Sequence, residues 1–496
     1  MILESAGGPS LGAALALAAP GGQVVSYGNS SRTGTSFLVD DFYPNQAVLR
    51  GFYLLADRRL RPVGADLRLL GELAVSGRLP VEVVEETGWD EAGSVLGRLR
   101  DRAIAGKAVL RLGDAGITDA TLDEAHREVR AKVRRVAETV IEPGAAVADA
   151  EGKFPEASHR ALVAEGLYAP HVPEAYGGQG ADALTSCLIV EEVARVCASS
   201  SLTPNVTRLA SLPLLLSGSV ELCERYLRPV REGAILAFAL SEPEAGSDAA
   251  SLRTRAVREG DGYRLDGEKR WITNAGVADY YVVAAVTEPD AGGISLFVVH
   301  STDEGLSVGP GEDKLGMRGS PTCPVYLRGV HVPADRLVGA EGQGLRLALG
   351  ALDHSRITIA AQAVGIAQGA LDHAAAYLTA RRQFGRPLAD FQGLRFKLAD
   401  MAMTLEAARQ LTYAAAARSA LDSADLRFFS AAAKCFASDT AMRVTVDAVQ
   451  LLGGHGYTRN SPLERMMRDA KVTQIYEGTN EILRTVVAKQ VLTDHG

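Results

Sequence analysis

The spacing of hydrophobic residues changes repeatedly along the chain, and each change predicts a different kind of structure. Over residues 1–115, short apolar runs that suit buried strands alternate with segments of helical spacing. We expect strands at 1–4, 23–27, 47–53 and 107–112 and helices at 67–75 and 90–102. Strands that alternate with helices form parallel sheets, so this segment is predicted to be α/β.

Residues 119–235 follow a short polar junction and have helical spacing. One helix is expected over 122–141 and should stop before Pro143-Gly144. Another is expected over 183–198, ending in the serine-rich stretch 199–201. This part of the chain is therefore predicted to be a helical domain.

The pattern becomes strand-like over 236–344 and helical again over 345–496. Residues 280–286 and 294–299 read as strands, and Asp261-Gly262 indicates a hairpin turn. Because no helices connect these strands, we expect an antiparallel barrel or sandwich. Long Ala- and Leu-rich helices follow, interrupted at Gly385-Arg-Pro387 and Gly453-Gly-His-Gly456. The sequence thus predicts a multidomain α+β protein.

Composition and charge exclude several classes of protein. A chain of 496 residues, 47% hydrophobic and 23% charged, is too long for one core and has a globular composition. Its net charge of −8 gives no general attraction to nucleic acid or anionic lipid, and no apolar run suits membrane insertion. Five cysteines without a C-x-x-C pair, and no H-E-x-x-H, predict neither a metal site nor a disulfide framework. We expect a cytoplasmic location.

Two segments near the start of the strand-like region combine residues that suit a flat, anionic cofactor. In Leu240-Ser-Glu-Pro-Glu-Ala-Gly-Ser-Asp248, Gly246 and Ser247 allow an anionic ligand to approach the backbone. In Lys269-Arg-Trp-Ile-Thr-Asn274, strand alternation places Trp271 and Thr273 on one face. A polar turn and a core tryptophan are the alternative interpretations.

Three segments of the C-terminal region also carry candidate ligand contacts. Arg381-Arg-Gln-Phe-Gly-Arg-Pro-Leu388 offers an Arg, an amide and a Phe that could clamp a pyrophosphate and cover a ring, or form a solvated basic helix end. Gln450-Leu-Leu-Gly-Gly-His-Gly-Tyr457 supplies a glycine turn, in which we interpret His455 as a turn residue. Gln474-Ile-Tyr-Glu-Gly-Thr-Asn-Glu-Ile482 places Glu477 just before a helix.

Together, in this order and at these separations, these blocks resemble the acyl-CoA dehydrogenase family over residues 119–496. The loop Pro173-Glu-Ala-Tyr-Gly-Gly178 and the run Lys314-Leu-Gly-Met-Arg-Gly-Ser320 are also similar to that family. The resemblance implies an N-terminal α domain over 119–235, a middle antiparallel β domain over 236–344 and a C-terminal four-helix bundle over 345–496.

The resemblance also implies a reaction. Such enzymes use FAD to convert an acyl-CoA into a trans-2-enoyl-CoA: a base removes the α proton while the β hydrogen leaves as hydride to flavin N5. Glu477 matches the base, and its burial should raise its pKa toward neutrality. Some relatives place the base immediately before the residue that matches Arg356, but Ser355 stands there and cannot act as a carboxylate.

Further residues are assigned to the cofactor and substrate by the same resemblance. The expected cofactor contacts are Phe238, Leu240, Ser241, Gly246, Ser247, Trp271, Thr273, Arg381, Gln383, Phe384, Gln450, Gly454 and Thr479. The expected substrate contacts are Ser247, Asp353, Arg356, Tyr476 and Gly478, although Asp353 and Arg356 could instead form an ion pair on a helix surface. Five of the cofactor contacts would reach the FAD of a neighbouring subunit, namely Arg381, Gln383, Phe384, Gln450 and Gly454, which implies a homo-oligomer, a dimer or a tetramer. The expected electron acceptor is an electron-transferring flavoprotein.

Three alternatives stay open at this point. A desaturase of an acyl or aminoacyl thioester bound to a carrier protein would keep the same fold and base. An acyl-CoA oxidase would differ in forming peroxide in air. A non-enzymatic scaffold is disfavoured for 119–496 by the number of matching blocks.

Residues 1–115 resemble the C-terminal part of a quinone oxidoreductase of the medium-chain dehydrogenase/reductase family. The resemblance rests on Leu3-Glu-Ser-Ala-Gly-Gly8, Ala19-Pro-Gly-Gly-Gln-Val-Val-Ser-Tyr-Gly28 and Arg102-Ala-Ile-Ala-Gly-Lys-Ala-Val-Leu110. That family's catalytic domain and glycine-rich nucleotide turn would precede residue 1. We therefore expect a partial Rossmann-like segment that cannot hold NADPH alone: an interaction module, a fusion remnant or the product of a misplaced start site.

Overall fold

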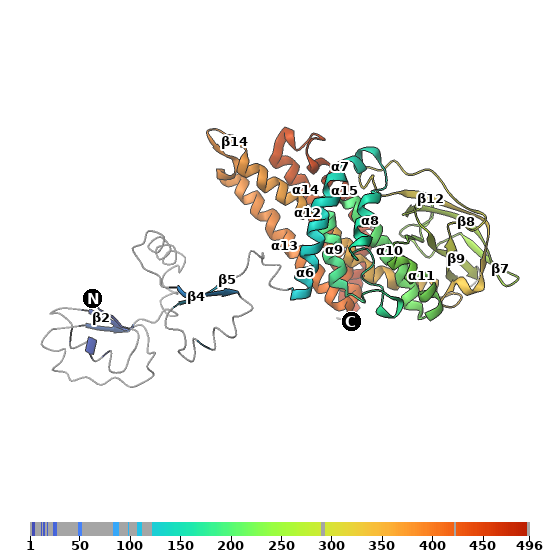
Figure 1. Ribbon diagram of the computed structural model, residues 1–496, viewed down its shortest axis with the longest axis horizontal. Helices are drawn as coiled ribbons and strands as arrows, with labels where there is room; N and C mark the ends of the chain where they lie inside the picture. The colour runs from blue at the N-terminus through green and yellow to red at the C-terminus, as the bar shows by residue number, and fades with distance from the viewer. Residues whose placement is uncertain are drawn as a thin grey trace. The chain divides into compact units, whose positions relative to one another are not determined.

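The computed structural model divides the chain into two units, Met1–Asp114 and Ala115–Gly496, each described by itself (Figure 1). In the second unit the structure describes residues 122–288, 293–420 and 423–493. In the first unit it describes residues 2–4, 11, 13–14, 17, 23–26, 48–51, 83–88, 98 and 107–111.

The described strands of the first unit pair in parallel. They are β1 (Ile2–Glu4), β2 (Gln23–Ser26), β3 (Val48–Gly51), β4 (Val83–Gly88) and β5 (Lys107–Arg111). The order β1-β2-β3 forms one sheet, and β4 pairs with β5. The sequence pattern anticipated each of these strands except β4, whose glutamates break its apolar run. The helices expected at 67–75 and 90–102 lie outside the described residues, apart from the helical Arg98.

The second unit begins with helices that share a core with part of the following sheet. These elements are α6 (Glu124–Val136), the π-helical turn η3 (Ala137–Ile141), α7 (Glu142–Glu151), α8 (Glu156–Ala164), the 3₁₀ turn η4 (Glu174–Tyr176), α9 (Ala183–Val196), α10 (Ala198–Ser217) and α11 (Val220–Arg231). Asp123 and Asp182 begin α6 and α9 by accepting hydrogen bonds from backbone N–H groups.

Two expected helix ends are wrong. The first helix does not stop before Pro143, because η3 leads directly into α7, which has Pro143 in its first turn. The serine-rich stretch 199–201 begins α10 instead of ending α9. The break falls at Cys197, whose backbone is extended, and the buried Ser201 hydroxyl is satisfied by Ala198 O at 2.8 Å.

One sheet of eight strands forms the middle of the unit. Its elements are β6 (Leu236–Ala239), β7 (Arg255–Glu259), β8 (Gly262–Thr273), β9 (Tyr280–Glu288), β10 (Gly293–His300), β11 (Leu306–Val308), β12 (Thr322–Pro333), the 3₁₀ turn η5 (Ala334–Arg336) and β13 (Leu337–Val338). The order is β11-β12-β8-β7-β9-β10-β13, with β6 on β9.

The pairing in this sheet is mostly antiparallel, as expected, but β6 and β7 each pair with β9 in parallel. The expected hairpin turn lies one residue earlier than Asp261-Gly262. Glu259 pairs with Gly262, so Gly260 and Asp261 form the turn, and Gly260 has the positive φ of 61° that the turn requires.

Alternating side chains tie the sheet to the helices. Tyr263, Phe297 and Val325 point into a core formed mainly by the sheet, against which Phe154 from the N-terminal helical domain also packs. Val282 and Leu296 belong to the core that the sheet shares with the N-terminal helices. Because strand residues alternate between faces, β9 and β10 join both cores and hold β6 at the domain boundary.

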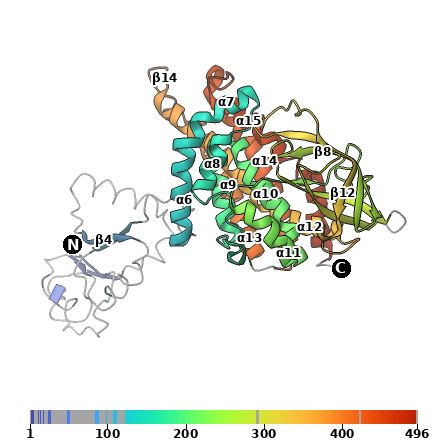
Figure 2. The ribbon, with the colours of Figure 1, turned by 45° about the vertical axis from the view of Figure 1, so that its right-hand side comes forward.

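Helices return after the sheet and pack around α12 (Figures 1 and 2). The elements are α12 (Gly344–Ala380), β14 (Arg382–Gln383), β15 (Arg386–Pro387), the 3₁₀ turn η6 (Leu388–Asp390), α13 (Gln392–Ala420), α14 (Leu426–Leu452), the 3₁₀ turn η7 (Gly453–His455), α15 (Pro462–Thr473) and α16 (Asn480–Thr493). The expected interruptions coincide with β15 and η7. A side chain at Gly365 would place its Cβ 2.2 Å from Glu191 O, so glycine there lets α12 lie directly against α9.

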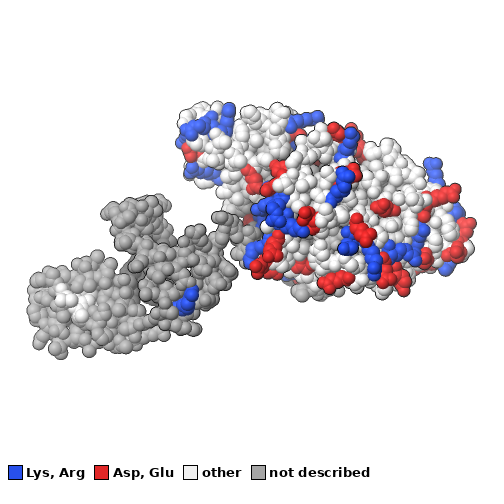
Figure 3. All heavy atoms as spheres, in the orientation of Figure 1, with Lys and Arg blue, Asp and Glu red and all other residues white. Residues whose placement is uncertain are grey.

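The surface of the second unit carries both signs of charge. Figure 3 shows basic and acidic side chains intermixed over one face, with Lys and Arg gathered at the end that carries β14. Among the described helices, none has the length and apolar character needed to cross a membrane.

Candidate active site

Glu477 lies in the turn between α15 and α16 and is held by two other helices. The Ser355 hydroxyl donates to its carboxylate at 2.7 Å, and Arg356 Nε donates to its backbone carbonyl at 3.1 Å. Lys434 Nζ donates to the next carbonyl, that of Gly478, at 2.7 Å. Because Ser355 and Arg356 lie on α12 and Lys434 on α14, the position of the carboxylate depends on the packing of the helical domain.

Backbone strain is concentrated at candidate site residues. Within the described part of the chain, five non-glycine residues have a positive φ: Trp271, Asn274, Met317, Phe384 and Glu477. Three of them, Trp271 (56°), Phe384 (52°) and Glu477 (53°), are residues that the sequence assigns to the site. Such conformations cost of order 1–3 kcal/mol each and persist where the surroundings impose them, often at functional sites.

The electrostatics around Glu477 suit a general base. Burial raises the pKa of its carboxyl, although the Ser355 hydroxyl and the cations Arg356, Lys434 and Arg208 oppose that rise. Burial also lowers the pKa of Lys434 to about 8. A carboxylate with a raised pKa binds a proton more strongly than a solvated one, so it can accept a weakly acidic proton.

Asp353 and Arg356 form the ion pair that the sequence offered as an alternative to substrate contact. Asp353 Oδ1 lies 2.5 Å from an Arg356 guanidinium nitrogen. The pair does not lie on the helix surface as that alternative supposed, because Arg356 is only 6% exposed. Arg356 therefore links the partly buried Asp353 to the backbone of Glu477.

The residues beside Glu477 stabilise the turn. The Tyr476 hydroxyl donates to Gln362 on α12. Thr479 begins α16, and its side-chain oxygen accepts from Ile482 N at 3.4 Å, as expected of an N-cap. Gly478 has a φ of 98°, which favours glycine.

A buried ion pair, which the sequence analysis missed, holds the loop after β6 against β8. Lys269 is fully buried, and its ammonium donates to Glu242 at 2.7 Å and to Leu240 O at 3.1 Å. Glu242 also accepts from the backbone N–H groups of Arg253 and Thr254. Burial lowers the pKa of Lys269 to about 8, and Lys269 holds the pKa of Glu242 below its usual range. Glu242 lies in the 240–248 segment and Lys269 in the 269–274 segment. Because these segments are distant in sequence, the sequence did not predict the contact between them.

The first group of expected cofactor contacts surrounds this loop. Trp271 is 52% exposed, whereas Ile272 beside it is buried. Ser241 O accepts from Arg270 N at 2.9 Å, which keeps Ser241 beside this end of β8, near Thr273. Gly246 and Ser247 are exposed, Phe238 is partly buried, and Leu240 is buried, so Leu240 can offer a ligand mainly its backbone. An exposed indole beside polar backbone groups fits a flat heterocycle.

The second group lies elsewhere. Arg381, Gln383 and Phe384 are exposed at the β14–β15 hairpin, and Phe384 is 91% exposed. In both ribbon views β14 lies at the opposite end of the second unit from β8 (Figures 1 and 2). Gln450 and Gly454 are exposed where α14 ends, and the neighbouring His455 ring lies 5.8 Å from that of Tyr377, near the end of α12. One chain therefore does not bring both groups to one ligand.

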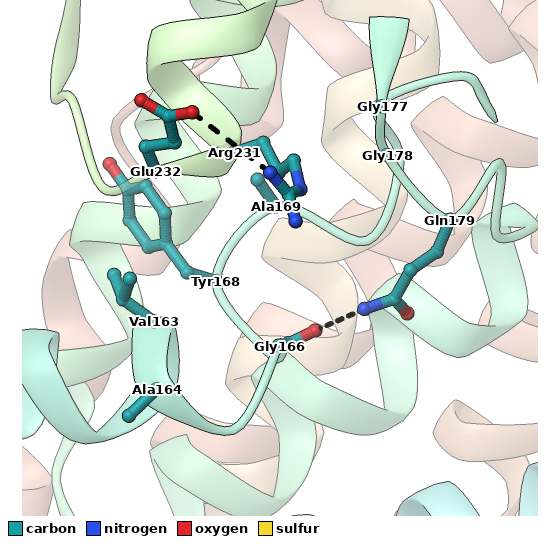
Figure 4. Close-up of a pocket in the computed structure, with 10 residues that line it drawn as sticks. All are labelled: Val163, Ala164, Gly166, Tyr168, Ala169, Gly177, Gly178, Gln179, Arg231 and Glu232. Atoms are coloured by element: carbon teal, nitrogen blue, oxygen red, sulfur yellow. Dashed lines mark hydrogen bonds and ion pairs between the residues drawn. The ribbon is translucent and has the colours of Figure 1, made fainter. Parts of the chain in front are cut away.

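A separate hollow of about 550 Å³ lies in the N-terminal helices (Figure 4). It borders the quoted loop at Gly177 and Gly178 but contains none of the expected site residues. Gln179 Nε2 donates to Gly166 O at 2.7 Å, and Arg231 lies 4.0 Å from Glu232. These polar groups pair with one another, so we assign the hollow no role. Among the described residues, no group of three or more His, Cys, Asp and Glu could hold a metal ion.

The second unit thus joins a helical domain, a β domain and a second helical domain, and the Glu477 carboxyl is held against α12. The chain matches the acyl-CoA dehydrogenase N-terminal domain over residues 123–234, the middle domain over 237–330 and the C-terminal domain over 342–492. It belongs to the acyl-CoA dehydrogenase family, and the expected fold of those three domains is confirmed. Members of this family are FAD-dependent enzymes.

Known proteins resemble most of the second unit. The chain is 56% identical over 374 residues to the probable acyl-CoA dehydrogenase fadE25 of Mycobacterium leprae, covering 75% of this chain and 96% of that protein. The structure of butyryl-CoA dehydrogenase from Megasphaera elsdenii is similar with a TM-score of 0.73 and 40% identity, over 75% of this chain and 99% of the other. The prolyl acyl carrier protein oxidase AnaB is similar with a TM-score of 0.72 and 30% identity, over 75% of this chain and all of the other.

Proposed function

We propose that this chain catalyses the α,β-dehydrogenation of an acyl-CoA thioester with Glu477 as the base. The observation that carries the proposal is the Glu477 carboxylate, which accepts a hydrogen bond from Ser355 at 2.7 Å and whose pKa is raised by burial. The family supports the same assignment, since its named relatives include acyl-CoA and butyryl-CoA dehydrogenases.

Glu477 removes the proton from the carbon next to the thioester carbonyl. Its carboxylate accepts that proton, while its own backbone N–H donates to the thioester oxygen, where negative charge develops. Arg356 and Lys434 hold the carbonyls of Glu477 and Gly478, so this N–H keeps its direction. Asp353, Arg356, Tyr476 and Gly478 thus act on the substrate mainly by fixing this turn, and Ser247 contacts the substrate or the cofactor.

The residues around β8 fit FAD. Phe238, Leu240, Ser241, Trp271 and Thr273 would hold its ring system, with Gly246 and Ser247 near the phosphates and Thr479 beside the base. FAD held there would supply the acceptor for the hydride that leaves the β carbon. The exposed Trp271 and the open space around Gly246 support this assignment.

Arg381, Gln383, Phe384, Gln450 and Gly454 would contact the FAD of a neighbouring subunit. Their exposure, and the distance in both ribbon views between β14 and β8, support a homo-oligomer in which each site is shared. An electron-transferring flavoprotein would then reoxidise the cofactor.

Anaerobic mixing of the purified holoenzyme with acyl-CoA tests the reaction. The yellow flavin absorbance should bleach with wild type, and Glu477→Gln should slow bleaching by about 10²–10⁴-fold, the usual contribution of a general base. Glu481→Gln, which alters a nearby exposed carboxylate, is the matched control and should bleach normally. Near-normal bleaching by Glu477→Gln would contradict the proposal.

The carrier-bound alternative has one supporting observation, the similarity to a prolyl acyl carrier protein oxidase. Bleaching only by a carrier-loaded substrate would favour it. Rapid peroxide formation in air would favour an oxidase. The greater identity to an acyl-CoA dehydrogenase, 56% against 30%, favours CoA.

Residues 1–115 are interpreted as a partial segment similar to a medium-chain dehydrogenase/reductase. The parallel pairing of β1, β2 and β3 supports an α/β segment of this kind. We assign it no reductase activity.

A further inference from the structure

Two unpaired hydrogen-bond donors lie next to the elements that hold Glu477. Arg208 on α10 is 7% exposed and its Nε has no partner; Asn205, one turn earlier on the same helix, is 1% exposed and its Nδ2 has no partner. Buried donors are normally satisfied, and leaving one unpaired costs about 1–3 kcal/mol. A missing acceptor is the feature that the two side chains share.

Their remaining contacts bring both to one turn of α12. Arg208 donates to His354 O at 3.3 Å, and Asn205 Oδ1 accepts from the Thr358 hydroxyl at 2.5 Å. Thr358 also donates to Ser355 O, and Ser355 holds the Glu477 carboxylate. Residues 354 to 358 span about one helical turn, a rise of roughly 6 Å, so Arg208 and Asn205 lie close to the base.

The charge of Arg208 identifies the kind of acceptor that is missing. Two other buried arginines, Arg356 and Arg409, each pair with a carboxylate, whereas Arg208, like the buried Arg465, has no such partner within 4.0 Å in the described part of the chain; unlike Arg465, Arg208 also has a buried nitrogen without an acceptor. Glu477 is close enough to oppose the fall that burial causes in the pKa of Arg208, but it makes no hydrogen bond with it. A buried guanidinium without an anion is costly, and a carboxylate satisfies it best.

We propose that Arg208 and Asn205 bind a second carboxylate at the far end of the acyl chain, so that the substrate is an ω-carboxyacyl-CoA. This inference rests on the proposed function, because the base fixes where the acyl chain begins. The acyl chain of the substrate would run from the carbon beside Glu477 along α10 and end at Arg208 Nε and Asn205 Nδ2. A neutral alkyl chain would leave both donors unpaired.

Calorimetric binding to full-length Glu477→Gln holoenzyme tests the proposal without turnover. The probes are straight-chain saturated acyl-CoA esters and ω-carboxyacyl-CoA esters of the same carbon number, in a series of lengths. At the best length, the ω-carboxyacyl ester should bind roughly 10- to 100-fold more tightly, as a charge-assisted hydrogen bond implies. Equal or weaker binding of the carboxylated series at every length would overturn the proposal.

Variants assign the preference to these side chains. In the Glu477→Gln background, a further Arg208→Gln change should abolish the preference for the ω-carboxyacyl ester, and Arg208→Lys should keep part of it. Asn205→Asp should reverse the preference, because its carboxylate repels the carboxylate of the substrate. A preference that survives both Arg208→Gln and Asn205→Asp would overturn the proposal. Arg208→Gln in the otherwise wild-type enzyme gives a second test. If this variant slows the reaction of neutral and carboxylated substrates equally and shifts the pH profile, Arg208 acts only on Glu477, and the proposal is wrong. If the ω-carboxyacyl ester binds preferentially but the wild-type flavin does not bleach, the proposed function is contradicted and the carboxylate-binding inference is supported.

Discussion

Ser355 occupies a position where some relatives carry a carboxylate base, and here its hydroxyl donates to the Glu477 carboxylate, which we propose as the base. The hydrogen bond to Glu477 stabilises the ionised carboxylate and so opposes the rise in pKa that burial causes. The absence of a carboxylate at residue 355 was readable from the sequence. The contact was not, because 122 residues separate the two side chains.

Ser355→Ala should move the pH profile. Because the base must be ionised to accept a proton, kcat/KM falls as the pH drops through the pKa of Glu477. Removing the Ser355 donor raises that pKa further, so the fall should begin at a higher pH than in wild type. Stopped-flow flavin reduction across a pH series measures the shift.

Ser355→Thr is the matched control for that series, since it restores a hydroxyl and should return the profile toward wild type. Unchanged profiles for both variants would mean that the Ser355 hydroxyl does not act on the base.

At the scale of elements, hydrophobic periodicity located most strands and helices but misplaced several ends. The pattern placed a stop before Pro143, yet proline is compatible with the first turn of α7. Likewise, the sequence predicted that the serines at 199–201 end a helix, but they lie within α10, where tertiary packing buries them. Helix ends depend on hydrogen bonds and neighbours that periodicity does not contain.

The loop after β6 depends on one buried ion pair. Lys269→Met leaves the Glu242 carboxylate without its cation, which should destabilise the fold by about 3–5 kcal/mol and reduce FAD content. Urea unfolding followed by tryptophan fluorescence, with the ratio of flavin to protein absorbance, measures both effects.

Arg264→Met on the same strand is the comparison, because its pair with Glu259 is exposed. Loss of an exposed pair costs at most about 1 kcal/mol. Equal losses of stability in the two variants would show that burial does not determine how much the Lys269–Glu242 pair contributes to the free energy of unfolding.

At the scale of the whole molecule, the expected cofactor residues form two groups at opposite ends of one unit. If neighbouring subunits complete each site, Trp271→Ala and Phe384→Ala damage different halves of it. Each variant alone should purify with little FAD. Co-expression of the two should restore FAD binding in part, because some sites in mixed oligomers receive both intact halves.

Differently tagged chains and tandem purification isolate the mixed oligomers for flavin absorbance. Co-expression of Trp271→Ala with Ser241→Ala, two changes in the same half, is the control and should not restore FAD. Restoration in neither mixture would contradict a shared site.

The division of the chain at Asp114 gives a second prediction at this scale. Deleting residues 1–115 should leave FAD content and dehydrogenation intact, because the family match begins at residue 123 and the core residue Leu122 is retained. Flavin absorbance and acyl-CoA bleaching compare the truncated and full-length proteins. A colourless, inactive product would show that the segment is integral.

The sequence by itself determined the order of the domains, the family and the position of Glu477 in a turn before a helix. These follow from periodicity and from short motifs, both of which are local along the chain. Only the tertiary structure decided what surrounds that carboxylate, which ion pair holds the loop after β6, and that Arg208 Nε and Asn205 Nδ2 lack an acceptor near Glu477. Those relations join residues far apart in sequence, and packing alone brings them within hydrogen-bonding distance or removes them from water.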